Sequence, residues 1–261
     1  MTFGTQTRRG VLGVGGGLTA SALLTSPVTA AVTEKGSVFV LVHGAWRGGW
    51  VWERVAERLR DAGATVYAPT LTGLAERSHL LRDDITLTTH INDVVGEMKW
   101  KDLTGVTLVG HSYAGMVITG VAEREAGRLK SIVYLDAALP RDGQAMRDVT
   151  GSRSPPTNGP LPPIPASAMV NPDDAPWVQQ KLTPQPGGTF SEPVANTGII
   201  QQLEKRTYIQ ATIGATPFFT AAYEACRSDP TWETGQLECR HDAMLDKPDE
   251  LAAMLLIAAG S

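Results

Sequence analysis

The sequence predicts one α/β domain, with a central, mostly parallel sheet of about six strands that is flanked by helices and carries a cap insertion. First, strand-like apolar runs alternate with helix-like segments from Ser37 onward, which is typical of a parallel sheet covered on both faces. Second, a proline-rich interval interrupts this alternation at about residues 141–196. Third, 261 residues with 42% hydrophobic and 19% charged content suit a single globular core.

Short apolar runs mark the expected strands, and a helical spacing of apolar residues marks the expected helices. The predicted strands are 37–42, 65–68, 106–109, 131–135 and 206–210, with a sixth expected within 233–239. The predicted helices are 52–60, 116–125 and 251–258. Because strands and helices alternate along the chain, the helices are expected to cover the sheet.

The interval 141–196 is expected to form the cap. It holds most of the 17 prolines and shows no strong period. A structureless stretch of this length is unusual inside a compact domain unless it has a function or contains short helices of its own. Residues 173–182 are expected to form one such helix. We therefore expect this segment to cover an active site within a domain that spans residues 31–261.

The first 30 residues are predicted to be a twin-arginine-type signal peptide. Thr7-Arg8-Arg9 precedes a weakly apolar run rich in glycine and alanine, and Val28-Thr29-Ala30 offers the small residues that a signal peptidase needs. The apolar run, at about 11–24, is too short and too rich in glycine for a membrane span. We therefore expect export to the periplasm or the extracellular space, without stable membrane association.

Composition narrows the class of partner. The 27 acidic and 23 basic residues give a net charge of -4 without long runs of either sign, so nucleic acid is not expected as a ligand. Cys226 and Cys239 are too few for a disulfide scaffold or a zinc site. They fit either one bridge or two buried thiols. The sequence leaves both a monomer and a homodimer open.

Ser112 is the predicted nucleophile because it lies between the third predicted strand and a helix. Such a strand-to-helix elbow strains the backbone of the serine and requires small residues two positions before and two positions after it. Gly110 and Ala114 occupy those positions, and Gly115 follows. The helix N-terminus also favours the negative charge that develops during acyl transfer. The alternative is an ordinary glycine-rich turn.

A serine hydroxyl needs a base, and His241 follows the last predicted strand, where a base is expected. The alternative for this residue is a histidine in a surface loop. Two backbone N–H groups are expected to bind the oxyanion, one from Tyr113 after the nucleophile and one from Ala45 after the first strand. The glycine-rich loop around Ala45 is also typical of a tight turn into a helix, and both interpretations can hold together.

These residues resemble the small α/β-hydrolases related to plant methylesterases and hydroxynitrile lyases, and especially their bacterial esterase relatives. The resemblance covers about residues 38–255 and is carried by HGAWRGGWVW (43–52), PTLTGLAERSHLL (69–81), GHSYAGM (110–116), VYLDAALP (133–140), LTPQPGGTF (182–190), TPFF (216–219) and HDAM (241–244). It implies the α/β-hydrolase fold with a cap, no cofactor or metal, and hydrolysis of small carboxylic esters.

The acid of the expected triad departs from the pattern of the plant enzymes. Those enzymes carry an aspartate after the fifth predicted strand, where this sequence has Gln-Ala-Thr-Ile-Gly at 210–214. Asp136 is predicted instead, because it follows the fourth strand on the carboxyl edge of the sheet where Ser112 and His241 are also expected. A turn or helix-capping aspartate is the alternative, and Glu204 and Glu224 are weaker substitutes.

Four residues are candidates for contact with a small-molecule ester. Trp46 and Phe218 are expected to line an apolar pocket, although their chemistry fits a core position equally well. Arg77 and His79 lie after the second strand, near the pocket mouth by resemblance, where a solvated loop is the alternative. The cap is expected to shape this pocket, so the sequence does not identify the ester.

Other functions are open on the same scaffold: a hydroxynitrile lyase, a cofactor-free oxygenase, or a ligand-binding receptor without catalysis. The lyases resemble one another in a threonine at the position of Gly44 and a lysine at that of Asp242. An aspartate there is expected to repel a leaving cyanide, which favours hydrolysis. The intact Ser112 and His241 disfavour a receptor.

Overall fold

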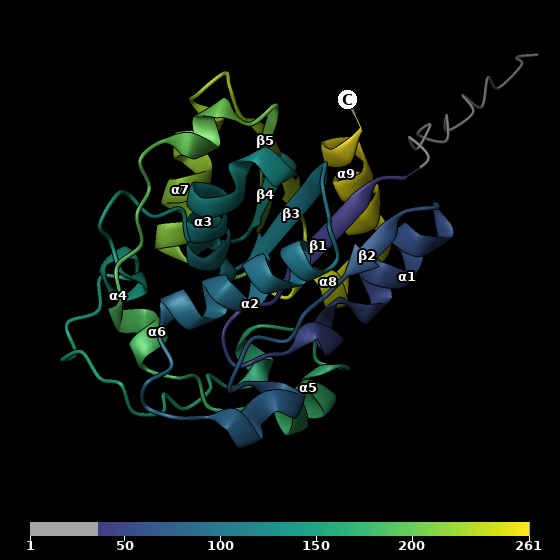
Figure 1. Cartoon of the computed structure of the whole chain (residues 1–261). Coiled ribbons are helices and arrows are strands. Elements are labelled where there is room, and N and C mark those ends of the chain that lie inside the picture. The colour runs from purple at the N-terminus through teal and green to yellow at the C-terminus, as the bar shows by residue number, and fades with distance from the viewer. Residues whose placement is uncertain (1–35, 261) are drawn as a thin grey trace, which may run out of the picture. The chain divides into compact units, whose positions relative to one another are not determined.

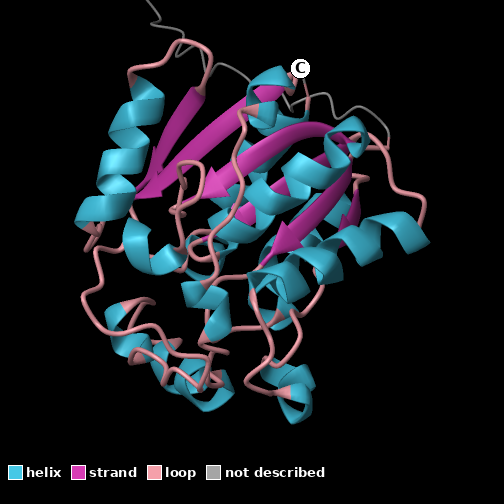
Figure 2. Ribbon diagram, turned by 60° about the vertical axis from the view of Figure 1, so that its left-hand side comes forward, coloured by secondary structure: helices cyan, strands magenta, loops and turns pink. Residues whose placement is uncertain are grey.

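A computed structural model describes residues 36–260, so the predicted signal peptide lies outside the described residues. Six strands form one sheet in the order β2-β1-β3-β4-β5-β6, and every neighbouring pair is parallel, as Figure 2 shows. The strands are β1 (Val38–Val42), β2 (Thr65–Tyr67), β3 (Val106–His111), β4 (Leu129–Leu135), β5 (Lys205–Ala211) and β6 (Glu233–Leu237). The predicted fold class is confirmed.

The sheet carries a hydrophobic core on each face, because successive side chains of a strand point to opposite sides. In β1, Val40 and Val42 belong to one core, while Phe39 and Leu41 belong to the other. Helices α2 (Leu87–Trp100), α3 (Ala114–Glu125) and α7 (Pro217–Arg227) cover the first core. Helices α1 (Glu53–Asp61), α8 (Ala243–Asp246) and α9 (Pro248–Ala259) cover the second, and Figure 1 shows the two layers.

Local sequence signals start several of these helices. Pro217 and Pro248 stand in the first turn of α7 and α9, where the missing N–H breaks no helical hydrogen bond. Thr86 and Thr89 form a capping box at the start of α2. Short 3-10 helices complete the connections: η1 (Gly49–Trp52), η2 (Ala75–Leu80), η3 (Ala126–Arg128) and η5 (Ile199–Gln202).

The interval 141–196 contains only short elements: α4 (Met146–Val149), η4 (Ala166–Ala168), α5 (Ala175–Lys181) and α6 (Gly188–Ser191). Helix α5 corresponds to the helix predicted over 173–182. A single bridge pairs Leu161 with Gln185 in antiparallel orientation. Figure 2 shows these segments on the side to which the strands point, so they adjoin the carboxyl edge of the sheet. In the part of the chain that the structure describes, no helix is long and apolar enough to cross a bilayer.

The two cysteines are free and buried, and they lie in different cores. Cys226 packs in the core beneath α7, whereas Cys239 packs in the core on the opposite face of the sheet. Because the sheet separates them, they cannot form a bridge. Burial raises the pKa of each thiol to about 12, so both are protonated at neutral pH. Of the two alternatives left by the sequence, buried thiols are confirmed.

Candidate active site

Ser112 occupies the turn between β3 and α3, in a conformation that an L-residue rarely adopts. Its φ is +58°, in the left-handed region. The turn is held from the neighbouring strand, because the Ser112 N–H donates to the Leu135 carbonyl at 3.2 Å and the Ser112 carbonyl accepts from the Ala138 N–H at 3.0 Å. The predicted strand-to-helix elbow is therefore present.

Two glycines make this elbow possible. A Cβ at Gly115 would lie 1.9 Å from the carbonyl oxygen of Ala138, and a Cβ at Gly110 would lie 2.8 Å from the carbonyl oxygen of Ala114. Both distances are too short for a side chain. The requirement for small residues thus falls on Gly110 and Gly115, which explains why Ala114 is accepted two positions after the serine.

His241 and Asp136 form a direct pair. His241 Nδ1 lies 2.7 Å from Asp136 Oδ2, and the Asp136 side chain is 2% exposed. A carboxylate accepts from Nδ1–H, which fixes the tautomer in which Nε2 carries no proton. The His241 ring also stacks on Phe219, with centroids 5.5 Å apart. Asp136 itself has a φ of +40°, and its N–H donates to the Ile209 carbonyl at 2.7 Å.

The structure brings neither alternative acid to this position. Glu204 and Glu224 are exposed, and Glu224 pairs with Arg227 on the surface of α7. After β5, where the plant enzymes are expected to carry their aspartate, Ile213 and Gly214 line the cavity instead. Within the described residues, Asp136 is the carboxylate that reaches His241.

The loop after β1 presents the backbone N–H of Ala45. Upstream, His43 Nε2 accepts from the Leu71 N–H at 3.0 Å, so its Nδ1 carries the proton and donates to the Gly44 carbonyl at 2.8 Å. Burial lowers the pKa of His43 to about 3, which keeps this arrangement neutral. The Gly44 carbonyl and the Ala45 N–H belong to the same planar peptide and point in opposite directions. The bond from His43 to this carbonyl therefore orients the Ala45 N–H. Within residues 36–260, neither this N–H nor that of Tyr113 donates to a protein acceptor.

Trp46 ties this loop to the cap. Its backbone is also in the left-handed region, with φ +64°. The Trp46 N–H donates to Gln185 Oε1 at 3.0 Å, its carbonyl accepts from the Thr183 N–H at 3.0 Å, and its indole N–H donates to the Leu161 carbonyl at 3.2 Å. The cap therefore fixes the conformation of the residue that follows Ala45.

One cavity of about 390 Å³ contains the predicted catalytic residues. Ser112, Asp136, His241, Ala45 and Tyr113 all line it. So do the predicted substrate contacts Trp46 and Phe218, together with residues that sequence reasoning did not single out: Met146, Thr150, Ile164, Ala168, Met169, Phe190, Ile213, Gly214, Thr216 and Phe219. The lining is mainly apolar and aromatic, and it includes no lysine or arginine among the described residues.

The other two predicted substrate contacts lie elsewhere. Arg77 and His79 are on η2, beside a separate surface hollow that Leu80 and Ile85 also line. Arg77 is engaged within the protein, because its guanidinium donates to the Thr70 carbonyl at 2.7 Å. The structure therefore does not bring these two residues to Ser112, and their expected contact with substrate is corrected.

Tyr113 is placed by its aromatic and histidine neighbours. Its ring stacks on Phe190 of the cap with centroids 5.4 Å apart. Its hydroxyl lies 3.1 Å from His90 Nδ1, while His90 Nε2 donates to the Thr72 carbonyl at 2.9 Å. Burial lowers the pKa of His90 to about 4, so its Nδ1 accepts from the tyrosine. These contacts fix the position of the buried Tyr113 side chain.

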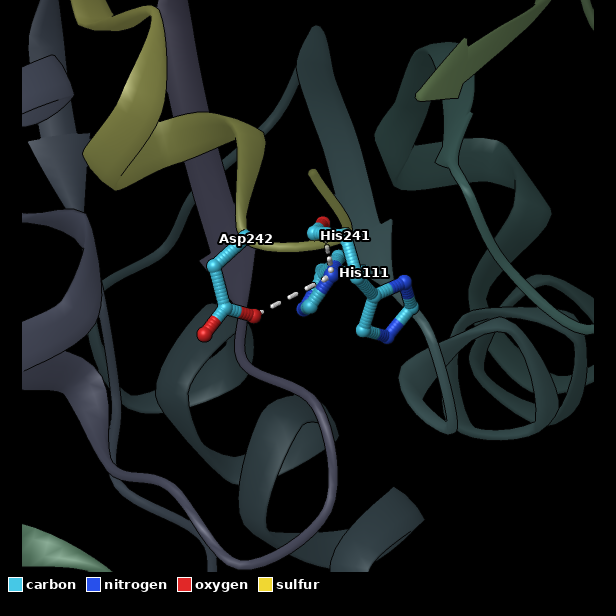
Figure 3. A group of neighbouring side chains, drawn as sticks. All are labelled: His111, His241 and Asp242. Atoms are coloured by element: carbon cyan, nitrogen blue, oxygen red, sulfur yellow. Dashed lines mark hydrogen bonds and ion pairs between the residues drawn. The ribbon is translucent and has the colours of Figure 1, made fainter. Parts of the chain in front are cut away.

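His111, His241 and Asp242 bring their ligand atoms within 4.8 Å of one another (Figure 3). Part of this group is engaged in hydrogen bonds, whereas His111 Nδ1 and Asp242 Oδ1 have no hydrogen-bond partner among the described residues. His111 Nε2 donates to the His241 carbonyl at 2.9 Å, and the Asp242 carboxylate accepts from Arg47 at 2.7 Å. A guanidinium beside the carboxylate would repel a cation. The group therefore fits a hydrogen-bond network rather than a metal site.

A larger hollow of about 650 Å³ lies between the cap and α7. Its lining includes Leu139, Asp142, Phe218 and Cys226 but no serine or histidine. Cys226 is a poor nucleophile there, because its raised pKa keeps the thiol protonated. The smaller cavity, which Ser112 and His241 line, is therefore the candidate active site.

Comparison with known proteins agrees with this geometry. A family model described as the alpha/beta hydrolase family matches residues 39–254. The chain belongs to the α/β-hydrolase family. The carbendazim hydrolyzing esterase of Nocardioides sp. (strain SG-4G) is 39% identical over 239 residues, covering 83% of this chain and 97% of that protein. An α-hydroxynitrile lyase of Arabidopsis thaliana is 30% identical over 108 residues, 41% of this α/β-hydrolase and 42% of the lyase.

The fold of this α/β-hydrolase recurs in solved structures. An extracellular α/β-hydrolase from a Paenibacillus species, described as sharing structural and functional homology with tobacco salicylic acid binding protein 2, superimposes with a TM-score of 0.72. The alignment covers 86% of this chain and 100% of that one at 24% identity. The predicted family and fold are confirmed, and the esterase among the relatives agrees with the predicted ester hydrolase.

Proposed function

We propose that this α/β-hydrolase is a serine esterase that cleaves small carboxylic esters, with Ser112, His241 and Asp136 as its catalytic triad. The observation that carries the proposal is the 2.7 Å contact between His241 Nδ1 and Asp136 Oδ2, in a cavity that Ser112 also lines. This contact leaves Nε2 free to take a proton. The 39% identity to an esterase over nearly its whole length supports the same reaction.

In the proposed reaction, His241 Nε2 takes the proton of the Ser112 hydroxyl as the oxygen attacks the ester carbonyl. The N–H groups of Ala45 and Tyr113 stabilise the oxyanion, and Asp136 stabilises the protonated imidazole. His241 then gives its proton to the leaving alcohol. A water, deprotonated by the same histidine, attacks the acyl-enzyme; the bond to Ser112 breaks, the acid leaves, and His241 returns the proton to the Ser112 oxygen.

The cavity supports small, neutral substrates. Its volume of about 390 Å³ lies at the lower end of the range for small-molecule sites. Two aromatic walls line it, one formed by Trp46, Tyr113 and Phe190 and one by Phe218 and Phe219. Without a lining cation, the cavity offers no partner for a charged carboxylate in the substrate. Carbendazim, named for the bacterial relative, is the first compound to test.

The experiment combines turnover with labelling of the serine. Purified protein is incubated with p-nitrophenyl acetate, and separately with a serine-directed phosphonate followed by peptide mass spectrometry. We expect nitrophenol release, one adduct at Ser112, and loss of at least about 10³-fold in kcat for Ser112→Ala. The control is Ser78→Ala, an exposed serine on η2 that is expected to leave turnover unchanged. A wild-type protein with neither release nor adduct would refute the proposal.

Two observations favour hydrolysis over hydroxynitrile lyase activity. A Cβ at Gly44 would lie 2.9 Å from His111 Nδ1 and 3.0 Å from Ser112 Cβ, so the threonine of the lyases would force a rearrangement. The cavity also has no lysine. Asp242 does not repel a leaving cyanide as the sequence predicts, because this carboxylate pairs with Arg47 and does not line the cavity. Incubation with mandelonitrile is expected to release no cyanide above background.

A binding protein without catalysis and a cofactor-free oxygenase remain the rival functions. The bond between His241 Nδ1 and Asp136, in a cavity that Ser112 also lines, supports a proton transfer that a binding protein does not need. Oxygen consumption measured in an electrode cell with the ester panel separates the oxygenase, because hydrolysis consumes no oxygen. Binding without turnover, measured by calorimetry on the same esters, would favour the receptor.

We also propose that residues 1–30 direct export through a twin-arginine pathway. Arg8 and Arg9 with the Val28-Thr29-Ala30 sequence support this proposal, as does the description of the Paenibacillus structural relative as extracellular. Expression of the full chain in a bacterium with this pathway is expected to yield a secreted protein that starts at residue 31. The variant Arg8→Lys/Arg9→Lys is expected to stay in the cytoplasm uncleaved. Equal secretion of both would contradict the proposal.

A further inference from the structure

A buried ion pair lies just outside the cavity. Arg47 and Asp242 are 1% and 0% exposed, and Arg47 Nη2 and Nε lie 2.7 Å and 3.1 Å from Asp242 Oδ2. Neither side chain lines the cavity. Burying two charges costs most of what their attraction returns, so such a pair rarely adds net stability over apolar residues of similar size. The pair therefore calls for a functional explanation.

The pair joins two loops that the sheet keeps apart. Arg47 follows β1 and Asp242 follows β6, which are separated by β3, β4 and β5 in the strand order. Besides Asp242, Arg47 Nη1 donates to the Ala45 carbonyl at 2.9 Å. Asp242 is the neighbour of His241 in the chain. One ion pair thus links the residue that supplies an oxyanion N–H to the residue next to the base.

A third loop meets the pair at the same point. His111, the neighbour of Ser112, donates from Nε2 to the His241 carbonyl at 2.9 Å and lies 3.9 Å from Asp242 Oδ1, as Figure 3 shows. Burial holds the pKa of His111 well below its usual range, so the ring is neutral. The loops that carry the nucleophile, the base and an oxyanion donor therefore converge on Asp242 and its partner.

From this convergence we propose that Arg47 and Asp242 are positioning residues that hold the Ala45 N–H and the His241 imidazole in register with Ser112. The inference rests on the proposed esterase function. Arg47 supplies the geometry through its fork of donors, which contacts Ala45 and Asp242 together. The opposite charges also cancel, so the pair places little net charge next to the base.

Three variants separate geometry from charge. Asp242→Asn keeps the shape of the side chain but leaves a guanidinium that cannot lose its proton. Arg47→Lys keeps the charge but loses the fork. Arg47→Met/Asp242→Leu removes both charges and fills the space with apolar atoms. The matched control is Arg206→Met, a 7% exposed arginine at the amino end of β5 that bonds backbone carbonyls far from the carboxyl edge.

We expect each of the three variants to lower kcat by about 10- to 100-fold with KM changed less than twofold, as for residues that orient a catalytic group. The double variant is expected to unfold at the same urea concentration as the wild type, because apolar replacements of a buried pair are tolerated. Its low kcat would then not reflect a loss of stability. Arg206→Met is expected to unfold earlier while keeping its kcat.

The pH profile of kcat/KM gives a second readout. The charged and titratable groups nearest His241 are Asp136 after β4, His111 at the end of β3, and the Arg47–Asp242 pair. Asp242→Asn leaves a positive charge near the imidazole, so the acidic limb is expected to move to lower pH. Arg47→Lys and the double variant preserve charge balance, so their limbs are expected to stay in place. If the pair had a purely structural role, the acidic limb of the kcat/KM profile would lie at the same pH in all three variants.

Amide hydrogen exchange tests whether the Arg47–Asp242 pair links the two loops, and it does so without measuring turnover. A negative exchange result is therefore distinguishable from a failure of the esterase proposal. Loss of the pair is expected to accelerate exchange in both the 43–50 and 238–246 segments of every variant, and in neither segment of Arg206→Met. Wild-type kcat in the double variant, or acceleration confined to the mutated loop, would overturn the inference. If the wild type hydrolyses no ester but the variants exchange faster in both segments, the esterase proposal is refuted and the structural link between the two loops still holds.

Discussion

Replacing Asp136 with asparagine is the sharpest test of the triad. The substitution preserves shape, but an amide can donate to His241 Nδ1, which lies 2.7 Å from the present carboxylate oxygen. That hydrogen bond selects the tautomer with the proton on Nε2, which cannot accept the serine proton. In a triad of this geometry the loss is about 10⁴-fold in kcat, or about 5 kcal/mol in activation free energy.

The assay measures kcat and KM for p-nitrophenyl acetate, with the unfolding temperature recorded for each variant. Glu204→Gln is the matched control, because it neutralises an exposed carboxylate that the sequence offered as a rival acid. We expect Asp136→Asn to keep its fold, because the asparagine still hydrogen-bonds to His241 Nδ1 and the substitution removes a charge from a side chain that is 2% exposed. Turnover of Asp136→Asn within tenfold of the wild type would refute the assignment.

Three further predictions follow from the packing. Gly115→Ala is expected to lower the free energy of unfolding by about 3 kcal/mol or more, because its methyl group would overlap a carbonyl oxygen. The control Gly127→Ala would contact no other atom and should be neutral. Equal urea midpoints for the two variants would contradict this prediction. Gln185→Leu leaves the Trp46 N–H without its acceptor, so kcat is expected to fall about tenfold. An unchanged kcat would contradict this prediction. Burial lowers the pKa of His43 to about 3 and that of His90 to about 4. Below about pH 6.5 these histidines are therefore protonated in the unfolded chain but stay neutral in the folded chain. From pH 6.5 to pH 5 the free energy of unfolding should fall by about 2 kcal/mol per histidine in urea titrations, and a flat profile would show that the rings accept protons when folded.

The strands and the three catalytic candidates could be predicted because their signals are local. Ser112 and Asp136 come directly after the apolar strands β3 and β4, and His241 comes four residues after the end of β6. A parallel sheet brings the carboxyl ends of its strands to one edge. Helix α2 also carried a signal, since its buried residues recur at helical spacing, at Leu87, Ile91, Val94 and Met98. For most strands, the predicted and observed boundaries differ by only a few residues.

The cap and the links between loops could not be predicted, because they depend on contacts between distant parts of the chain. Arg47 and Asp242 are 195 residues apart, and nothing near either one indicates its partner. The same holds for Trp46 and Gln185, although Gln185 lies in a segment that the family resemblance had marked. Arg77 and His79 were assigned to the pocket by resemblance alone, and the fold of η2 directs them elsewhere.

The strained backbone of the chain is concentrated at the cavity. Of the five non-glycine residues with positive φ among those described, Trp46, Ser112 and Asp136 line it. Each such conformation costs about 1–3 kcal/mol and persists only where its surroundings impose it. Here the cap holds Trp46, β4 holds Ser112, and β5 holds Asp136 through backbone hydrogen bonds. Since three separate neighbours maintain the strain at one cavity, the strain is expected to serve the proposed catalytic arrangement rather than the individual turns.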